Sequence, residues 1–266
     1  MGGTQVACAV VDPMYRVLRI NLWSGPRNVS TAVMYSFRQR SDTRVVDEPL
    51  YAHYLRVSGA GHPGREQVLA AMDNDGERVV RELVLGPCDR PVLFLKQMAH
   101  HLVELDRGFL RETVNLILTR DPEQMLPSLI HQLPEPRIHD TGLAMQSELL
   151  RQLHDLGQDP PVLDSRELLL DPEGVLCTVC ERTGIAFEPG MLRWPAGHKP
   201  EDGVWAPHWY ENVRRSTGFM PYIEKAEPFP ERVKPLLEEC RPHYEFLLSR
   251  AIRARPREAN LVTNST

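Results

Sequence analysis

The sequence predicts an α/β protein, a three-layer sandwich with a mainly parallel central sheet. Continuous apolar runs typical of buried parallel strands recur along the chain, as over residues 91–95 and 113–119. Amphipathic helical segments alternate with these runs, as in βαβ units. The first strand, residues 17–23, leads through a tight polar turn into a helix. These observations together favour helices packed on both faces of one sheet.

The expected strands are short and mostly apolar. They cover residues 17–23, 44–49, 91–95, 113–119 and 161–164. The expected helices show apolar residues at helical spacing, as with Val33, Met34 and Phe37 in the first of them. They cover residues 31–40, 67–84, 122–132, 141–156, 171–182 and 232–250.

Proline and glycine mark several boundaries between these elements. Pro122 and Pro172 fit the first turn of a helix, where the missing amide costs no hydrogen bond, and Gly184 fits the end of one. Residues 50–64 are rich in glycine and proline and are expected to form a loop. The remaining segments are expected to be helical or turn-like over 102–109, irregular over 195–203 and undefined over 205–215.

Composition excludes several functional classes. The chain has 266 residues with a net charge of −5, which gives no sign of a nucleic-acid surface. No apolar run approaches the length of a membrane span, and the N-terminus lacks the basic stretch of a secretory signal. The five cysteines show no metal-site spacing. We interpret them as core residues with free thiol groups, which predicts a reducing, cytoplasmic compartment. We expect a flexible leader over 1–16, a single domain over 17–255 and a tail over 256–266.

The turn over residues 24–31 predicts an anion site. A strand followed by a tight turn and a helix points backbone amides and the positive end of the helix dipole at one place. Arg27, Ser30 and Thr31 add a cation and two hydroxyl groups to that turn. No Gly-Lys pair follows Gly25, so the turn is not the one that binds ATP or GTP. The alternative is a well-capped turn that binds no ligand.

A second polar group of residues follows the strand over 113–119. Arg120 stands at the strand end, and Ser128 follows two helical turns later. An arginine fork and a hydroxyl group can hold a phosphate from two directions. The alternative is that Arg120 pairs with Asp121 or with a helix end. The turn at Ser24, Glu48, Lys96 and Arg120 each come at the end of a predicted strand. They are therefore expected at one rim of the sheet.

These segments resemble sulfotransferases that use 3′-phosphoadenosine 5′-phosphosulfate (PAPS). The resemblance implies that the three-layer α/β sandwich is of the P-loop nucleotide-binding type. In the first turn the resemblance rests on Pro26, Arg27, Ser30 and Thr31, whereas Asn28 and Val29 replace the Ser-Gly pair usual in the family. The resemblance continues in Arg-Asp-Pro at 120–122 with Ser128, and in the segments over 162–176 and 182–187. It covers roughly residues 17–190 in the family's order.

The resemblance implies a sulfotransferase that moves a sulfonyl group from PAPS, without a metal ion, to a small acceptor. Arg27, Asn28, Ser30 and Thr31 would hold the 5′-phosphate side, and Arg120 and Ser128 would hold the 3′-phosphate. Arg215 lies in a basic segment over 214–219 that would close over the nucleotide, as a basic segment does in cytosolic members. Arg27 and the loop amides would stabilise the charge of the transition state.

Sulfonyl transfer also needs a base that removes the proton of the acceptor. Glu48 is the first candidate, because a glutamate at this place resembles the base of bacterial and Golgi-type members. His100 is the second candidate and His101 the third; cytosolic members have a histidine two positions after the strand-end lysine, where this chain has Met98. Lys96 would act as a cation near the transferred group.

Two other functions remain open at this stage. An ATP-dependent phosphotransferase or nucleotide hydrolase would need Asp47 or Asp121 to hold Mg²⁺. A non-catalytic nucleotide-binding protein is the second alternative, since Val29 disfavours the positive φ that the family's glycine can adopt. The expected partner is a small hydroxyl- or amine-bearing acceptor, and a homodimer is left open. An aromatic cluster is expected to wall the acceptor pocket, or else to be core: Tyr51, His53, Tyr54, Trp205, His208, Trp209 and Tyr210.

Overall fold

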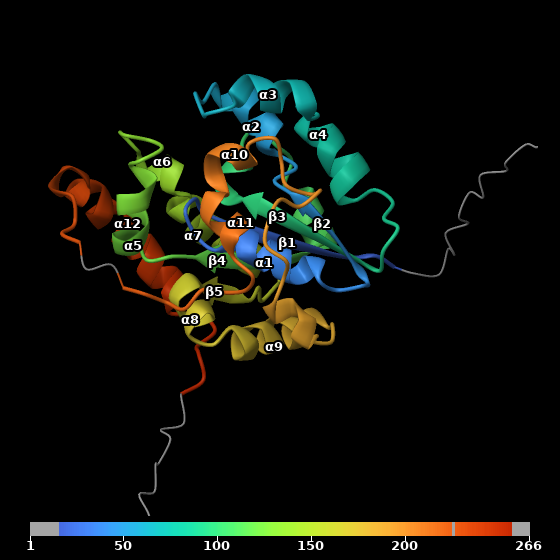
Figure 1. Ribbon diagram of the computed structural model, residues 1–266. Coiled ribbons are helices and arrows are strands. Elements are labelled where there is room, and N and C mark those ends of the chain that lie inside the picture. The colour runs from blue at the N-terminus through green and yellow to red at the C-terminus, as the bar shows by residue number, and fades with distance from the viewer. Residues whose placement is uncertain (1–15, 225–226, 257–266) are drawn as a thin grey trace, which may run out of the picture.

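The computed structural model describes residues 16–224 and 227–256 (Figure 1). The leader and the tail predicted from the sequence therefore lie almost wholly outside the described residues. The described strands form one all-parallel sheet with the order β2-β3-β1-β4-β5. Their bounds are β1 Leu18–Ser24, β2 Thr43–Asp47, β3 Val92–Met98, β4 Val114–Thr119 and β5 Val162–Asp164. The prediction of an α/β fold with a parallel sheet is confirmed.

The register brings the carboxyl ends of the strands to one edge of the sheet. Ser24, the last residue of β1, lies opposite Met98 on one side and Leu118 on the other. Asp47 at the end of β2 lies opposite Lys96 of β3. Segments that follow β1, β2, β3 and β4 therefore meet at this edge, where α/β proteins bind their ligands.

Apolar residues alternate between the two faces of the sheet, and helices cover both. On one face α1 (Ser30–Arg38) and α9 (Pro172–Thr183) pack with Ile20, Leu22 and Phe94. On the other face α7 (Leu143–Asp155) and α12 (Lys234–Leu248) pack with Trp23 and Leu95. Each face of the sheet thus has its own apolar cluster. This is the expected three-layer arrangement.

A smaller third apolar cluster lies beyond the ends of β2 and β3. It joins α2 (Tyr51–Ser58), α3 (Arg65–Ala71) and α10 (Ala206–Trp209), which gather at one end of the molecule with α4 (Gly76–Val79) (Figure 1). The expectation of a loop over 50–64 was wrong for its first half. Tyr51, Tyr54 and Leu55 are buried there, and the helix that carries them ends at Gly59, whose φ is 69°.

Two predicted helices are interrupted. The helix expected over 67–84 ends at Ala71, and α4 begins after Asp75, whose side chain accepts a hydrogen bond from the amide of Arg78 at 3.2 Å. A π-helical turn over Val80–Val84 follows. The helix expected over 141–156 is divided at Gly142, with a φ of 73°, into α6 (Ile138–Thr141) and α7.

The other segments differ in smaller ways. The helices expected over 122–132 and 232–250 are α5 (Pro122–Leu129) and α12, and β3 runs to Met98, so that Lys96 lies inside the strand rather than after it. No sequence-based prediction covers α8 (Ser165–Leu170), and α10 and α11 (Glu211–Arg215) fall in the stretch left undefined over 205–215. The 3₁₀ turns cover Ala99–His101, Gly108–Glu112, Pro189–Leu192 and Glu231–Val233. The second of them overlaps the end of the segment over 102–109 that was expected to be helical or turn-like, and the fourth the start of the helix expected over 232–250. In the described part of the chain, no helix has the length and apolar character needed to span a membrane.

Candidate active site

A cavity of about 430 Å³ opens at the carboxyl edge of the sheet. It brings together residues that come from the ends of four strands and from the third apolar cluster. Ten of the eleven residues singled out from the sequence line it: Arg27, Asn28, Ser30, Thr31, Glu48, Lys96, His100, His101, Arg120 and Ser128. We call the part with Arg27 and Arg120 the donor end, and the part beyond Glu48 the acceptor end.

The turn after β1 is held tightly against the rest of the sheet. A Cβ atom on Gly25 would lie 2.6 Å from the carbonyl oxygen of Thr141, so that only glycine fits there. The side chain of Asn28 accepts a hydrogen bond from the Ser30 amide at 2.9 Å and donates one to the Leu118 carbonyl at 3.2 Å. Asn28 therefore shapes the turn. The remaining amides at the start of α1 belong to a helix terminus that favours anions.

Arg27 and Arg120 lie side by side at the donor end. Arg27 donates a hydrogen bond to the Ser128 hydroxyl at 2.8 Å, and Arg120 donates one to the Arg27 carbonyl. Burial lowers the pKa of both guanidinium groups, and for Arg120 the nearby charge of Arg27 lowers it further. Within residues 16–224 and 227–256 neither of them forms an ion pair with a carboxylate. Two half-buried cations without a counterion make a strong site for an anion.

Backbone strain occurs at both ends of the cavity. Arg27 has a φ of 56° and Glu48 a φ of 42°, in the left-handed region that non-glycine residues rarely adopt. Strain of this kind persists where the surroundings enforce it, often at functional sites. Val29 has a φ of −93°, so the conformational objection to valine in this turn does not apply. The position that needs a positive φ is Arg27.

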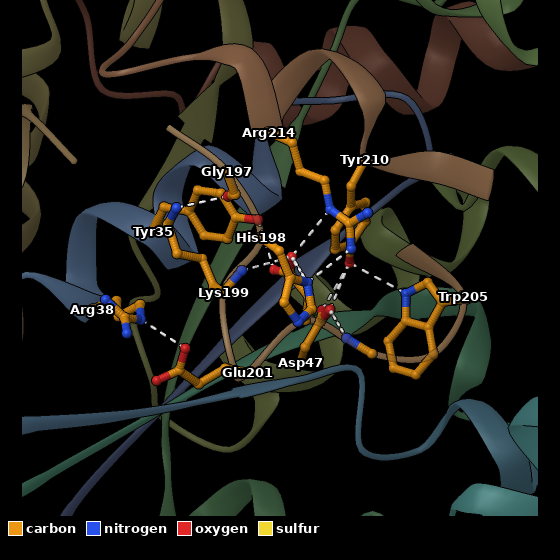
Figure 2. Close-up of polar contacts among 12 residues, drawn as sticks. Tyr35, Arg38, Asp47, Gly197, His198, Lys199, Glu201, Trp205, Tyr210 and Arg214 are labelled. Carbon is orange, nitrogen blue, oxygen red and sulfur yellow. Dashed lines mark hydrogen bonds and ion pairs between the residues drawn. The ribbon is translucent and has the colours of Figure 1, made fainter. Parts of the chain in front are cut away.

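Lys96 lies in a buried polar cluster at the acceptor end. Its ammonium group donates to Glu48 at 2.5 Å, to Asp47 at 2.8 Å and to the Tyr210 hydroxyl at 2.6 Å. The Tyr210 hydroxyl also contacts both carboxylate oxygens of Asp47, at 3.0 and 2.7 Å, and accepts from the Trp205 indole at 3.2 Å (Figure 2). Each charged group here has a partner of opposite charge, as burial requires.

Glu48 and Lys96 influence each other's ionisation in this cluster. Burial raises the pKa of Glu48, while the charge of Lys96 opposes that rise. Burial also disfavours the ammonium form of Lys96, but Asp47 and Glu48 outweigh it and raise the pKa of Lys96 well above its usual value. Lys96 is therefore charged. Glu48, with one carboxylate oxygen bound to Lys96, is the group whose raised pKa suits proton transfer.

His100 and His101 are buried against aromatic rings. His101 stacks on Tyr51 at 5.0 Å and on Tyr54 at 4.7 Å between ring centroids. Burial lowers the pKa of His100 to about 3 and that of His101 well below its usual value. Their Nδ1 atoms have no hydrogen-bond partner among the described residues. Both rings are thus uncharged at neutral pH.

Arg215 is the site candidate that the cavity does not include. It lies on α11 with a side chain that is 70% exposed and paired with Glu211. The neighbouring Ser216, Gly218 and Phe219 do line the cavity. The predicted basic segment therefore reaches the site through its small and aromatic residues, while Arg215 faces solvent.

Several lining residues were not singled out from the sequence. Tyr51 contacts His62 at 3.0 Å between the hydroxyl group and Nδ1, and His62, Gln132 and Asp140 line the acceptor end. The available signal was weak: His62 is a lone histidine in a glycine- and proline-rich stretch. Asp47 was considered only as a metal ligand, and the structure engages it with Lys96 and Tyr210.

The segment over 197–203 connects this site to α1 (Figure 2). Asp202 accepts from the Tyr35 hydroxyl of α1 at 2.6 Å, and the Gly203 amide donates to Asp47 at 3.3 Å. Lys199 donates to the carbonyls of Pro195 and Gly197, both at 2.7 Å. The Gly203 amide thus contacts one carboxylate oxygen of Asp47, while Lys96 contacts the other.

The fold and the cavity define an α/β protein with two guanidinium groups, unpaired with any described carboxylate, beside the turn after its first strand. The sulfotransferase domain family matches residues 18–251, and the chain belongs to this family. Two curated relatives from Arabidopsis thaliana are branched-chain-amino-acid aminotransferase-like proteins 2 and 1, each 39% identical over 229 and 231 residues. These alignments cover 86% of this chain and 41% of each relative, so the chain spans about two fifths of their length.

A solved structure, the sulfotransferase domain from the curacin biosynthetic pathway, shares the fold. It is 14% identical, with a TM-score of 0.50, over 85% of this chain and 98% of that domain. At this identity the likeness supports the architecture alone. The function of this chain has to be argued from its own residues.

Proposed function

We propose that the protein is a PAPS-dependent sulfotransferase that acts on a hydroxyl or amino group of a small molecule. The observation that carries the proposal is the pair Arg27 and Arg120, two adjacent guanidinium groups with no carboxylate partner in the described chain, beside the start of α1. A donor with phosphate groups at two positions supplies the anions that this arrangement lacks. Family membership supports the same donor.

The residues of the donor end have distinct roles in this proposal. Arg27, Ser30 and Thr31 bind the 5′-phosphosulfate with the amides of the turn, and Asn28 keeps that turn in shape. Arg120 and Ser128 bind the 3′-phosphate and thereby fix the position of the donor, which is a contribution of orientation. Arg27 also faces the charge that builds up as the sulfonyl group leaves the phosphate.

Glu48 is the proposed base. Its carboxylate takes the acceptor proton while the acceptor oxygen or nitrogen attacks sulfur in line with the departing phosphate oxygen. Lys96, held by Asp47 and Tyr210, is positioned to stabilise charge beside the transferred group. His100 remains the second candidate for the base, because its neutral ring lines the same cavity. His101 is the third.

The placement of the carboxylates speaks against the phosphotransferase alternative. That reaction would use Asp47 or Asp121 to hold Mg²⁺. Asp47 accepts hydrogen bonds from Lys96 and Tyr210, and Asp121 caps α5 through the Glu123 amide at 2.8 Å. Both groups are therefore engaged in other interactions. Cytoplasmic location and dimerisation stay sequence-based predictions.

Ligand binding tests the proposal directly. Adenosine 3′,5′-bisphosphate is expected to raise the melting temperature by several degrees, because a ligand that binds only the folded state stabilises it. Mg-ATP at the same concentration is expected to give a smaller shift. A shift with Mg-ATP alone would reject the proposal. Binding of the bisphosphate without turnover over a broad panel of acceptors would favour a non-catalytic nucleotide-binding protein.

A further inference from the structure

The acceptor end has walls of a distinctive composition. Tyr51 packs edge-on against Trp205, with ring centroids 5.2 Å apart, and its hydroxyl group contacts His62. The His62 ring lies 6.3 Å from the ring of Trp209, and Asp140 acts electrostatically on His62. All five residues line the cavity. The acceptor end therefore combines aromatic rings with a second carboxylate, that of Asp140, besides Glu48.

The charges at this end exclude one class of acceptor. Among the described residues that line it, Lys96 is the single lysine or arginine, and Asp47 and Glu48 already neutralise it. Burial lowers the pKa of His62, as it does that of His100, so the histidines add no positive charge at neutral pH. A carboxylate or phosphate on the acceptor would thus meet no cation here, and would face Glu48 and Asp140.

The cavity contains unpaired polar groups that can accept hydrogen bonds from a ligand. The amide oxygen of Gln132 is buried and has no partner in the described part of the chain, and the same holds for Nδ1 of His100 and His101. Each neutral imidazole offers one nitrogen lone pair, and carbonyl and carboxylate oxygens only accept. A protonated amine brings three donors and no acceptor. Aromatic faces, Trp and Tyr above all, attract such a cation.

We propose that the acceptor carries a protonated amino group, held among Tyr51, His62, Trp209 and Asp140, and presents a separate hydroxyl group to Glu48. This inference rests on the proposed sulfotransferase function. In the transfer step the acceptor oxygen forms a bond to sulfur, and its proton passes to the Glu48 carboxylate. The bond between sulfur and the 5′-phosphate oxygen breaks, and its electron pair stays on that phosphate as the leaving group.

Three phenols of similar size test the charge preference: tyramine (cationic), 4-ethylphenol (neutral) and 3-(4-hydroxyphenyl)propionate (anionic). With PAPS as donor, kcat/KM is expected to be at least about tenfold higher for tyramine than for 4-ethylphenol, a ratio typical of a cation in a partly desolvated aromatic site. The anionic phenol is expected to be the poorest substrate. Equal values for all three, or a preference for the anion, would overturn the inference and leave the sulfotransferase function intact.

A pair of variants tests the role of the carboxylate. Asp140→Asn is expected to lower the tyramine to 4-ethylphenol ratio of kcat/KM about fivefold or more, because the charge is lost. An asparagine can still accept the hydrogen bond that Asp140 receives from the Arg137 amide at 2.8 Å. Glu135→Gln, an exposed change outside the cavity, is the matched control and should keep the parent ratio. An unchanged ratio in Asp140→Asn would contradict the proposed site.

Binding separates this inference from the proposed function. Titration calorimetry of the complex with adenosine 3′,5′-bisphosphate should show tighter binding of tyramine than of the other two phenols. Binding of tyramine with this preference but without turnover would keep the amine site and reject the sulfotransferase function. No binding of tyramine, or binding no tighter than that of the anionic phenol, would overturn the amine site.

Discussion

The two ends of the cavity differ in whether their charged side chains have partners of opposite charge. At the donor end, Arg27 and Arg120 lie together and no described carboxylate pairs with either of them. At the acceptor end, Lys96 is enclosed by Asp47, Glu48 and Tyr210. The first arrangement is incomplete until an anion binds, whereas the second is complete without a ligand. The donor end therefore favours an anion, whereas the charges at the acceptor end are already balanced.

The two ends also differ in how the chain builds them. The donor end comes from two segments directly after β1 and β4, over residues 27–31 and 120–128. The acceptor end is assembled from more segments: the ends of β2 and β3, α2, the 3₁₀ turn after β3, α6 with the segment before it, and α10. Substitutions at the two ends should accordingly affect different steps.

The largest expected effect concerns Glu48. Glu48→Gln should reduce kcat by about 10²–10⁴, the usual contribution of a general base, while the affinity for adenosine 3′,5′-bisphosphate stays within about twofold. Steady-state kinetics and titration calorimetry measure the two quantities. If turnover survives in Glu48→Gln and is lost in His100→Ala, the base is His100.

The pH profile of the parent enzyme provides a control for that assignment. In the proposed mechanism Glu48 acts in its ionised form, and burial raises its pKa. Turnover should therefore fall as the pH decreases through a value above the usual one for glutamate, about 4.3. Glu48→Gln should lose this acid limb. A limb that persists in the variant would assign it to another group.

Arg120 tests the donor end. Arg120→Ala should weaken the binding of adenosine 3′,5′-bisphosphate by about 1.5–3 kcal/mol, because a charge-assisted hydrogen bond to phosphate is lost. Titration calorimetry gives the change, and Arg111→Ala, at an exposed arginine outside the cavity, is the matched control. Unchanged affinity in a folded Arg120→Ala variant would remove Arg120 from the site.

His100 links the acceptor end to the stability of the fold. Its pKa is about 3 in the folded protein, against about 6.5 when unfolded, so the unfolded state binds more protons between these values. The neutral, buried His100 therefore contributes to the free energy of unfolding fully above about pH 6.5, and this contribution is lost as the pH falls toward about 3. From pH 7 to pH 5 the loss should be about 2 kcal/mol in urea denaturation. An equally steep dependence on pH in His100→Gln would contradict it.

The smallest effect is expected at Arg215. Its side chain is exposed and paired with Glu211, and exposed pairs contribute little, so Arg215→Ala should change donor affinity by less than about 0.5 kcal/mol. Calorimetry in parallel with Arg120→Ala makes the comparison. A loss as large as that of Arg120→Ala would mean that the segment over 214–219 rearranges to cover the donor.

The sequence predicted the sheet and the donor end better than the acceptor end, for physical reasons. Buried parallel strands and the turn after β1 have local patterns, and the register of the sheet alone brings Arg27 near Arg120. The helix α2 was missed because its stability comes from packing against Trp205 and Tyr210, far away in the sequence. The length of β3 was underestimated, since Lys96 is polar and its buried partners come from other segments.

The hydrogen bonds of Tyr210 could not be predicted for the same reason. Its hydroxyl group meets Asp47 and Lys96 across a separation of 163 and 114 residues. No spacing rule covers such a contact. The sequence shows that aromatic residues cluster over 205–210, but it does not show that the Tyr210 hydroxyl group forms hydrogen bonds with Asp47 and Lys96.

At Arg27, the left-handed backbone lowers the stability of the fold, while the side chain is the one proposed to bind the donor. Holding an arginine at a φ of 56° costs on the order of 1–3 kcal/mol, a penalty that glycine would avoid. Engineering this chain for heat resistance by melting temperature alone would therefore tend to select Arg27→Gly and discard its guanidinium group. A screen carried out with a saturating nucleotide present would reverse that ranking, since tight binding returns several kcal/mol to the folded state.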